Sequence, residues 1–137
     1  MENATPTVYV VDDEPDVLRA LSRLLRSVGL RVQTYDDAFT FLDVVDEAFN
    51  GCVVLDLSMP DLDGLAVQRL LAEKDCRLPV VFLTGNGDAV ASATAMQQGA
   101  VAFLSKPVDA EVLLGAVRAA LAGNAVADAG ADGPGAR

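Results

Sequence analysis

The most constraining feature of this sequence is a regular alternation between short apolar runs and longer segments with helical periodicity. The short runs are predicted as β-strands and cover residues 7–11, 31–34, 52–55, 79–83 and 101–104. The first, third and fourth runs are almost continuously apolar, which is typical of strands buried on both faces of a parallel sheet. The second run is more polar and is predicted as an edge strand.

The intervals between these runs have helical patterns. In the first interval Val17, Leu21 and Leu24 recur at helical spacing, Pro15 suits a first helical turn and Gly29 suits a helix stop. Further helices are predicted over residues 38–45, 65–71, 88–98 and 109–121. Five strands that alternate with five helices predict a doubly wound (βα)5 sandwich of the α/β class, with right-handed crossovers.

The length of 137 residues suits one domain, and 52% hydrophobic residues predict a well-buried core. We expect an N-terminal extension over residues 1–6, a single domain over 7–122 and a disordered Gly/Ala/Asp-rich tail over 123–137. No apolar run approaches the roughly 18 residues of a membrane helix, and the acidic N-terminus does not resemble a signal peptide. We therefore expect a cytoplasmic protein.

The charge and the residue types exclude several functions. A net charge of −10 disfavours direct binding to nucleic acid and to anionic membranes. The chain has no histidine, which excludes Ser-His-Asp and Cys-His catalysis, His-ligated zinc and a phosphoryl group carried on its own imidazole. Cys52 and Cys76 match no metal or redox motif.

Polar and charged residues follow four of the predicted strands. Asp12 and Asp13 follow the first strand, Asp56 the third, Thr84 the fourth and Lys106 the fifth. In an open parallel sheet the carboxyl ends of the strands form the ligand-binding edge. Three carboxylates at one edge repel each other unless cations compensate them, and oxygen ligands of this kind suit Mg²⁺.

Each of these residues also has a simpler interpretation. Asp12 and Asp13 precede Glu14 and Pro15 and could cap a helix. Asp56 could be a turn residue, and a single lysine after a strand usually faces solvent. The simpler interpretation weakens because all of these residues are predicted at the same edge.

Four motifs make the resemblance to a known family specific. They are VVDDEP at residues 10–15, VLDLSMPDLDG at 54–64, LTGNGD at 83–88 and FLSKP at 103–107. Their order and spacing resemble those of the receiver domains of bacterial two-component response regulators, the CheY-like family, from about residue 7 to residue 121. The last two motifs are most similar to the FixJ-like members. The resemblance implies a flavodoxin-like sheet of strand order 2-1-3-4-5.

The resemblance also implies a role for each residue of the acidic edge. Asp56 would be the nucleophile and become an aspartyl phosphate. Asp13, Asp56 and the backbone carbonyl of Ser58 would bind Mg²⁺ directly, and Asp12 would act through a metal-bound water. Lys106 would pair with Asp56 at rest and with the phosphoryl oxygens afterwards.

Three further residues and the partners are implied in the same way. Thr84 would donate its hydroxyl to the phosphoryl group, Pro107 would follow a cis peptide bond, and Phe103 occupies the aromatic switch position. The phosphoryl donor would be a sensor histidine kinase or a histidine phosphotransfer protein. Phosphorylation would alter the surface formed by the fourth helix, the fifth strand and the fifth helix, which would contact an unknown downstream protein or form a homodimer.

Rival interpretations concern both the chemistry and the output. A haloacid dehalogenase-like phosphohydrolase needs a second aspartate two residues after the nucleophile, where this chain has Ser58. A flavodoxin-like cofactor module needs a phosphate-binding loop where this chain has acidic residues, and a degenerate receiver would lack Asp56, Thr84 or Lys106. We expect a stand-alone receiver that catalyses only its own phosphorylation and dephosphorylation. The alternative is the N-terminal receiver of a FixJ/NarL-type transcription factor.

Overall fold

The predicted alternation of strands and helices is confirmed in the computed structural model, which describes residues 6–46, 48–59, 62–74, 76–85 and 89–123. The strands are β1 (Thr7–Val11), β2 (Arg31–Tyr35), β3 (Gly51–Asp56), β4 (Val80–Thr84) and β5 (Ala102–Ser105). The helices are α1 (Pro15–Ser27), α2 (Ala38–Val44), α3 (Gly64–Glu73), α4 (Ala89–Gln97) and α5 (Ala110–Leu121). The expected N-terminal extension and C-terminal tail fall almost entirely outside the described residues.

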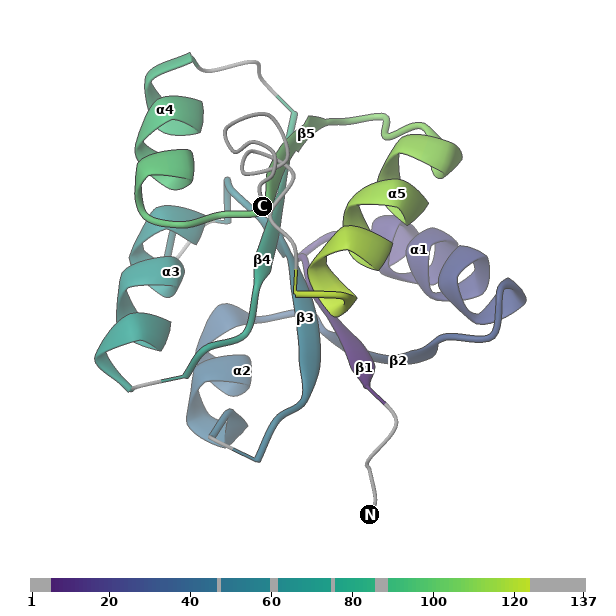
Figure 1. The fold of residues 1–137 in the computed structure, drawn as a ribbon, viewed down its shortest axis with the longest axis horizontal. Coiled ribbons are helices and arrows are strands. Elements are labelled where there is room, and N and C mark those ends of the chain that lie inside the picture. Colours follow the sequence, from purple (N-terminus) through teal and green to yellow (C-terminus); the bar gives the residue numbers. More distant parts are fainter. Residues whose placement is uncertain (1–5, 47, 60–61, 75, 86–88, 124–137) are drawn as a thin grey trace.

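The five strands form one parallel sheet in the order β2-β1-β3-β4-β5, as the resemblance implies. Figure 1 shows α1 and α5 on one face of this sheet and α2, α3 and α4 on the other. The exposed positions of β2 confirm that it is an edge strand, whereas β1, β3 and β4 are buried over nearly their whole length. Asp12, Asp56 and Thr84 therefore lie at the ends of the three inner strands of the sheet.

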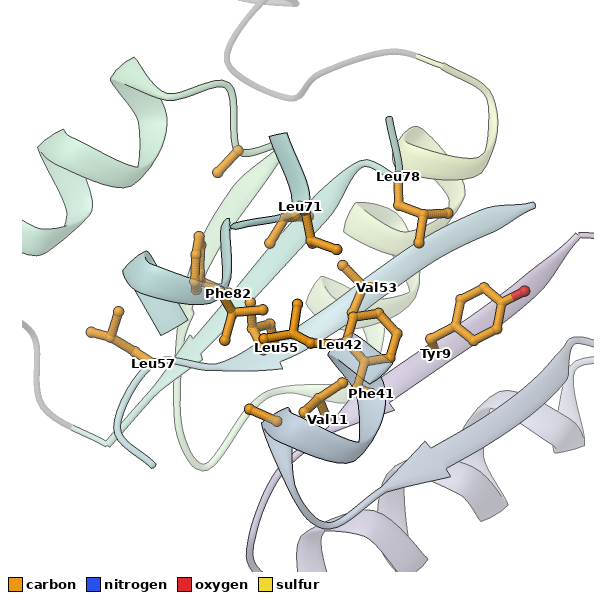
Figure 2. Packing of buried hydrophobic residues seen from close by; sticks show 14 of the residues in the cluster. Tyr9, Val11, Phe41, Leu42, Val53, Leu55, Leu57, Leu71, Leu78 and Phe82 are labelled. Atoms are coloured by element: carbon orange, nitrogen blue, oxygen red, sulfur yellow. The ribbon is translucent and has the colours of Figure 1, made fainter. Parts of the chain in front are cut away.

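Two hydrophobic clusters, one on each face, hold the sheet between the helices. On the α2–α4 side Phe41 and Phe82 are fully buried, and they pack with Val11, Val53 and Leu55 from the central strands. Figure 2 shows these side chains packed together beside the central strands. The second cluster joins α1 and α5 to the opposite face. Burial on both faces makes the central strands rigid supports for the residues at their ends.

Local signals in the sequence explain where the helices begin and end. Asp109 caps α5 by accepting a hydrogen bond from the backbone N–H of Val112. Gly29 and Gly99 follow α1 and α4 with φ of 88° and 98°, a conformation that favours glycine. No helix in the described ranges is long and apolar enough to span a lipid bilayer.

Strands β2 to β5 each end one residue later than predicted. Asp56 is the last residue of β3 and pairs with Leu83, and Thr84 is the last residue of β4 and pairs with Ser105. The apolar runs themselves stop one residue earlier, at Leu55 and Leu83. The parallel ladder nevertheless includes both residues, so the sheet itself fixes their backbones.

Candidate active site at the carboxyl edge of the sheet

The three aspartates predicted to meet at the sheet edge do meet there. Asp12 follows β1 and is fully buried, Asp56 ends β3 and is 3% exposed, and Asp13 is exposed. One carboxylate oxygen from each of the three lies within 4.8 Å of the others. The strand order β1-β3 brings them together, because β1 and β3 are neighbours in the sheet and not in the sequence.

Lys106 reaches this cluster from β5 and contacts three carboxylates. Its Nζ lies 3.0 Å from Asp12 Oδ2, 2.8 Å from Glu14 Oε1 and 3.5 Å from Asp56 Oδ1. The lysine side chain is 18% exposed, so it does not face solvent as a single lysine after a strand usually does. At rest its nearest partners are Asp12 and Glu14, and Asp56 is the most distant of the three.

Glu14 is the residue of this cluster that sequence reasoning missed. It was considered only as a neighbour of the two aspartates before a helix. Its carboxylate instead accepts a hydrogen bond from Lys106, which lies 92 positions later in the sequence. The contact arises because the loops after β1 and β5 lie at the same edge of the sheet, and no local pattern in the sequence signals it.

The loop between β1 and α1 is held by Asp12. Asp12 Oδ1 accepts a hydrogen bond of 2.9 Å from the backbone N–H of Glu14, and the backbone N–H of Asp12 donates to the carbonyl of Tyr35. The N-cap of α1 is Glu14, which makes no side-chain capping bond. Simple helix capping therefore does not account for Asp12 and Asp13.

The loop after β3 is held against the sheet by backbone hydrogen bonds. Leu57 donates its N–H to the carbonyl of Leu83, and Gly64 donates its N–H to the carbonyl of Leu57, both at 2.8 Å. The backbone N–H of Ser58 donates to Asp56 Oδ1 at 3.3 Å. The first two bonds fix the loop, and the bond from Ser58 orients the Asp56 carboxylate.

The surroundings of the site raise the pKa of both Asp56 and Lys106, for different reasons. Burial raises the pKa of Asp56 to about 6, and the Asp12 charge adds to this rise, while Lys106 and the Ser58 N–H oppose it. Burial lowers the pKa of Lys106, but its contacts with Glu14, Asp12 and Asp56 outweigh burial and raise it. Lys106 is therefore a permanent cation, and Asp56 is mostly ionised at neutral pH.

The remaining predicted residues surround the carboxylates. Thr84 is buried, and its carbonyl accepts a 2.7 Å hydrogen bond from the backbone N–H of Lys106. The Lys106–Pro107 peptide bond is cis, the isomer that the resemblance implies. Phe103 is half-buried, with its ring centroid 5.9 Å from that of Phe82. Thr84 and Lys106 thus share the edge with the aspartates, and Phe103 lies on the outer strand β5.

The donor set at this edge fits a divalent metal ion. The cluster offers carboxylate oxygens, and Asp12 Oδ2 is a buried oxygen that makes no hydrogen bond in the described part of the chain, although it pairs with Lys106. Within the described part of the chain, the site brings together the carboxylates of Glu14 and the three aspartates and the ammonium group of Lys106. A hard cation with oxygen ligands would balance this excess of negative charge.

Comparisons with known proteins agree with this geometry. The profile of the family described as "Response regulator receiver domain" matches residues 8–118. The response regulator TmoT of Ectopseudomonas mendocina is 45% identical over 121 residues, which are 88% of this chain and 55% of TmoT. The transcriptional regulatory protein TdiR of Thauera aromatica is 47% identical over 118 residues, which are 86% of this chain and 52% of TdiR.

The fold comparison gives the same result. The crystal structure of FixJ-N has a TM-score of 0.80 and 34% identity, and the match covers 89% of this chain and 96% of that one. The chain spans about half the length of the curated relatives TmoT and TdiR. The predicted resemblance, including that to FixJ-like members, is confirmed: the chain belongs to the response regulator receiver domain family.

Proposed function

We propose that Asp56 is the phosphoacceptor of this receiver domain. The observation that carries the proposal is the meeting of the Asp12, Asp13 and Asp56 carboxylates with Lys106 at one edge of the sheet. Asp56 is the member of this cluster that ends a central strand and has its carboxylate oriented by a backbone N–H. An ionised carboxylate fixed in this way is a suitable oxygen nucleophile.

The phosphoryl group would come from a phosphohistidine of another protein, a sensor histidine kinase or a histidine phosphotransfer protein. The chain has no histidine, so the donor imidazole must belong to the partner. In the transfer the bond between phosphorus and the imidazole nitrogen breaks, and a bond between phosphorus and an Asp56 carboxylate oxygen forms. The phosphoryl oxygens then carry the negative charge that Lys106 and the Thr84 hydroxyl would stabilise.

The metal ion that we propose is Mg²⁺. Asp13, Asp56 and the backbone carbonyl of Ser58 would hold it directly, and Asp12 would hold one of its water ligands. When bound, Mg²⁺ supplies positive charge to the transferring phosphoryl group. Asp12 and Lys106 keep the surrounding charges in fixed positions, so that little rearrangement is needed during transfer.

The output would be a change in the surface formed by α4, β5 and α5. Phosphorylation would convert the singly charged Asp56 carboxylate into an aspartyl phosphate that carries about −1.5 to −2, and its oxygens would draw Thr84 toward the phosphoryl group. Phe103 would turn further inward against Phe82, and the surface that carries the exposed Val90 of α4 and Val112 of α5 would change. A downstream protein or a second copy of the chain would bind this surface.

The receiver unit would comprise residues 7–122 and would lie in the cytoplasm, where a sensor kinase would phosphorylate it. A stand-alone receiver and the N-terminal receiver of a FixJ/NarL-type transcription factor both stay predictions for the output.

The rival hydrolase function predicts steady release of phosphate from a phosphomonoester. We expect no such turnover, because this chemistry needs an aspartate as general acid two residues after the nucleophile, and this chain has Ser58 there.

Exposure to acetyl phosphate and Mg²⁺ tests the proposed function. Intact-mass spectrometry should show the gain of one phosphoryl group in the wild-type protein and none in Asp56→Asn. EDTA should abolish the gain in the wild type. An unmodified wild-type mass, or an equal gain in Asp56→Asn, would overturn the proposal.

A further inference from the structure

Lys106 has three carboxylate partners that differ sharply in their freedom to move. The side chains of Asp12 and Asp56 are 1% and 4% exposed, whereas that of Glu14 is 59% exposed. The two aspartates are confined by the core of the sheet. Glu14 can rotate into water without opening the protein.

The Glu14 side chain has no competing structural task among the contacts that the structure describes. It lies at the N-cap of α1 but makes no capping hydrogen bond. Its backbone is fixed by the bond from its N–H to Asp12 Oδ1, so the carboxylate remains within reach of Lys106. Its contact of 2.8 Å is the shortest that Lys106 makes with a carboxylate.

An incoming phosphoryl group must compete with these carboxylates for the lysine. An ammonium group has three N–H donors, and all three carboxylates lie within reach of them at rest. The buried aspartates cannot withdraw, so the donor that is freed for a phosphoryl oxygen is the one that Glu14 holds. Release of Glu14 also removes a negative charge from the immediate surroundings of Lys106.

We propose that Glu14 is a positioning residue that restrains Lys106 in the unphosphorylated protein and thereby slows its engagement with the phosphoryl group. This inference rests on the proposed function of Asp56. It assigns to Glu14 control over the rate of phosphorylation and no direct contact with the reacting atoms.

The lysine signals of the protein test the contact without any phosphoryl donor. The chain has only two lysines, Lys74 and Lys106, so a protein labelled with carbon-13 at the lysine ε position gives two resonances. Lys74 bonds to the carbonyl of Leu42 and serves as the internal reference. In Glu14→Gln the Lys106 resonance should move and that of Lys74 should not. An unchanged Lys106 resonance would overturn the proposal.

The rate of phosphorylation tests the consequence of the contact. With acetyl phosphate and Mg²⁺, Glu14→Gln should react roughly two- to fivefold faster than wild type, the range expected for loss of an ion pair with one exposed partner. Asp16→Asn is the matched control, because Asp16 lies on the exposed side of α1 and pairs with Arg19. Its rate should stay that of wild type.

The outcomes separate this proposal from the function on which it rests. Equal acceleration in Glu14→Gln and Asp16→Asn would mean a general effect of charge and would overturn the role of Glu14. A shifted Lys106 resonance with an unchanged rate would overturn it as well, while leaving Asp56 as the phosphoacceptor. No phosphoryl uptake in any of the proteins would overturn the proposed function, and this inference with it.

Discussion

The backbone of Gly64 lies so close to the carbonyl oxygen of Asp56 that no side chain fits between them. A Cβ atom on Gly64 would be 2.8 Å from that oxygen and 2.9 Å from the Cα atom of Leu57. The N–H of Gly64 also bonds to the carbonyl of Leu57. The first residue of α3 thus holds the loop that follows the proposed nucleophile.

Substitution of this glycine should disturb both stability and the site. Gly64→Ala is expected to lower the free energy of unfolding by about 1 to 3 kcal/mol, because backbone atoms must shift to admit the methyl group. Urea denaturation followed by circular dichroism measures the change. Mg²⁺ affinity should fall in the same variant, because the loop after Asp56, which carries the proposed Ser58 carbonyl ligand, moves.

Gly115 in the middle of α5 provides the matched control. A Cβ atom there would meet nothing within 4 Å. Gly115→Ala should therefore stabilise the protein by roughly 0.5 to 1 kcal/mol through helix propensity and leave Mg²⁺ affinity unchanged. Similar losses of stability in Gly64→Ala and Gly115→Ala would contradict the close contact at Asp56.

The raised pKa of Asp56 predicts a specific dependence of stability on pH in metal-free protein. The pKa is about 6 in the folded chain and about 3.9 in an unfolded chain. Between these values the folded protein binds more protons, so its stability falls as the pH rises through this window. Above pH 6 the ionised Asp56 destabilises the fold fully.

Asp56→Asn should remove this penalty. In EDTA at pH 7 the variant is expected to be more stable than wild type by on the order of 2 kcal/mol, and the gain should shrink toward pH 4. Thermal unfolding across this range measures both effects. Asp43→Asn, the same change at an exposed position of α2, should give no comparable trend. A constant gain for Asp56→Asn at every pH would refute the assignment of the penalty to ionised Asp56.

Loss of Asp13 should weaken Mg²⁺ binding with little effect on the fold. Asp13 is exposed, and its carboxylate belongs to the acidic cluster. Asp13→Asn is expected to lower Mg²⁺ affinity at least tenfold, measured by isothermal titration calorimetry, because a charged ligand of a hard cation is lost. Asp16→Asn removes the same charge three residues later and should bind Mg²⁺ like wild type. Equal affinities in the two variants would contradict the proposed ligand set.

Most of the fold could be predicted because its signals are local. The apolar runs of β1, β3 and β4, the cap at Asp109 and the glycine after α1 each act within a few residues. The acidic edge was also predictable, because the carboxyl ends of all strands in a parallel sheet lie at the same edge.

The missing parts depend on contacts between distant segments. The pair between Glu14 and Lys106 joins two loops that only the folded sheet brings together. The need for glycine at position 64 arises from its approach to Asp56 and to Phe82 on the neighbouring strand. Neither contact leaves a periodic or local pattern, so neither could be predicted from the sequence.

The position of the phosphoryl group in the chain tests the central claim most directly. After reaction with acetyl phosphate and Mg²⁺, borohydride reduces an aspartyl phosphate to homoserine, and peptide mass spectrometry locates the altered residue. Homoserine is predicted at position 56 and at no other aspartate. Homoserine at Asp12, Asp13 or any other position, with Asp56 intact, would contradict the account.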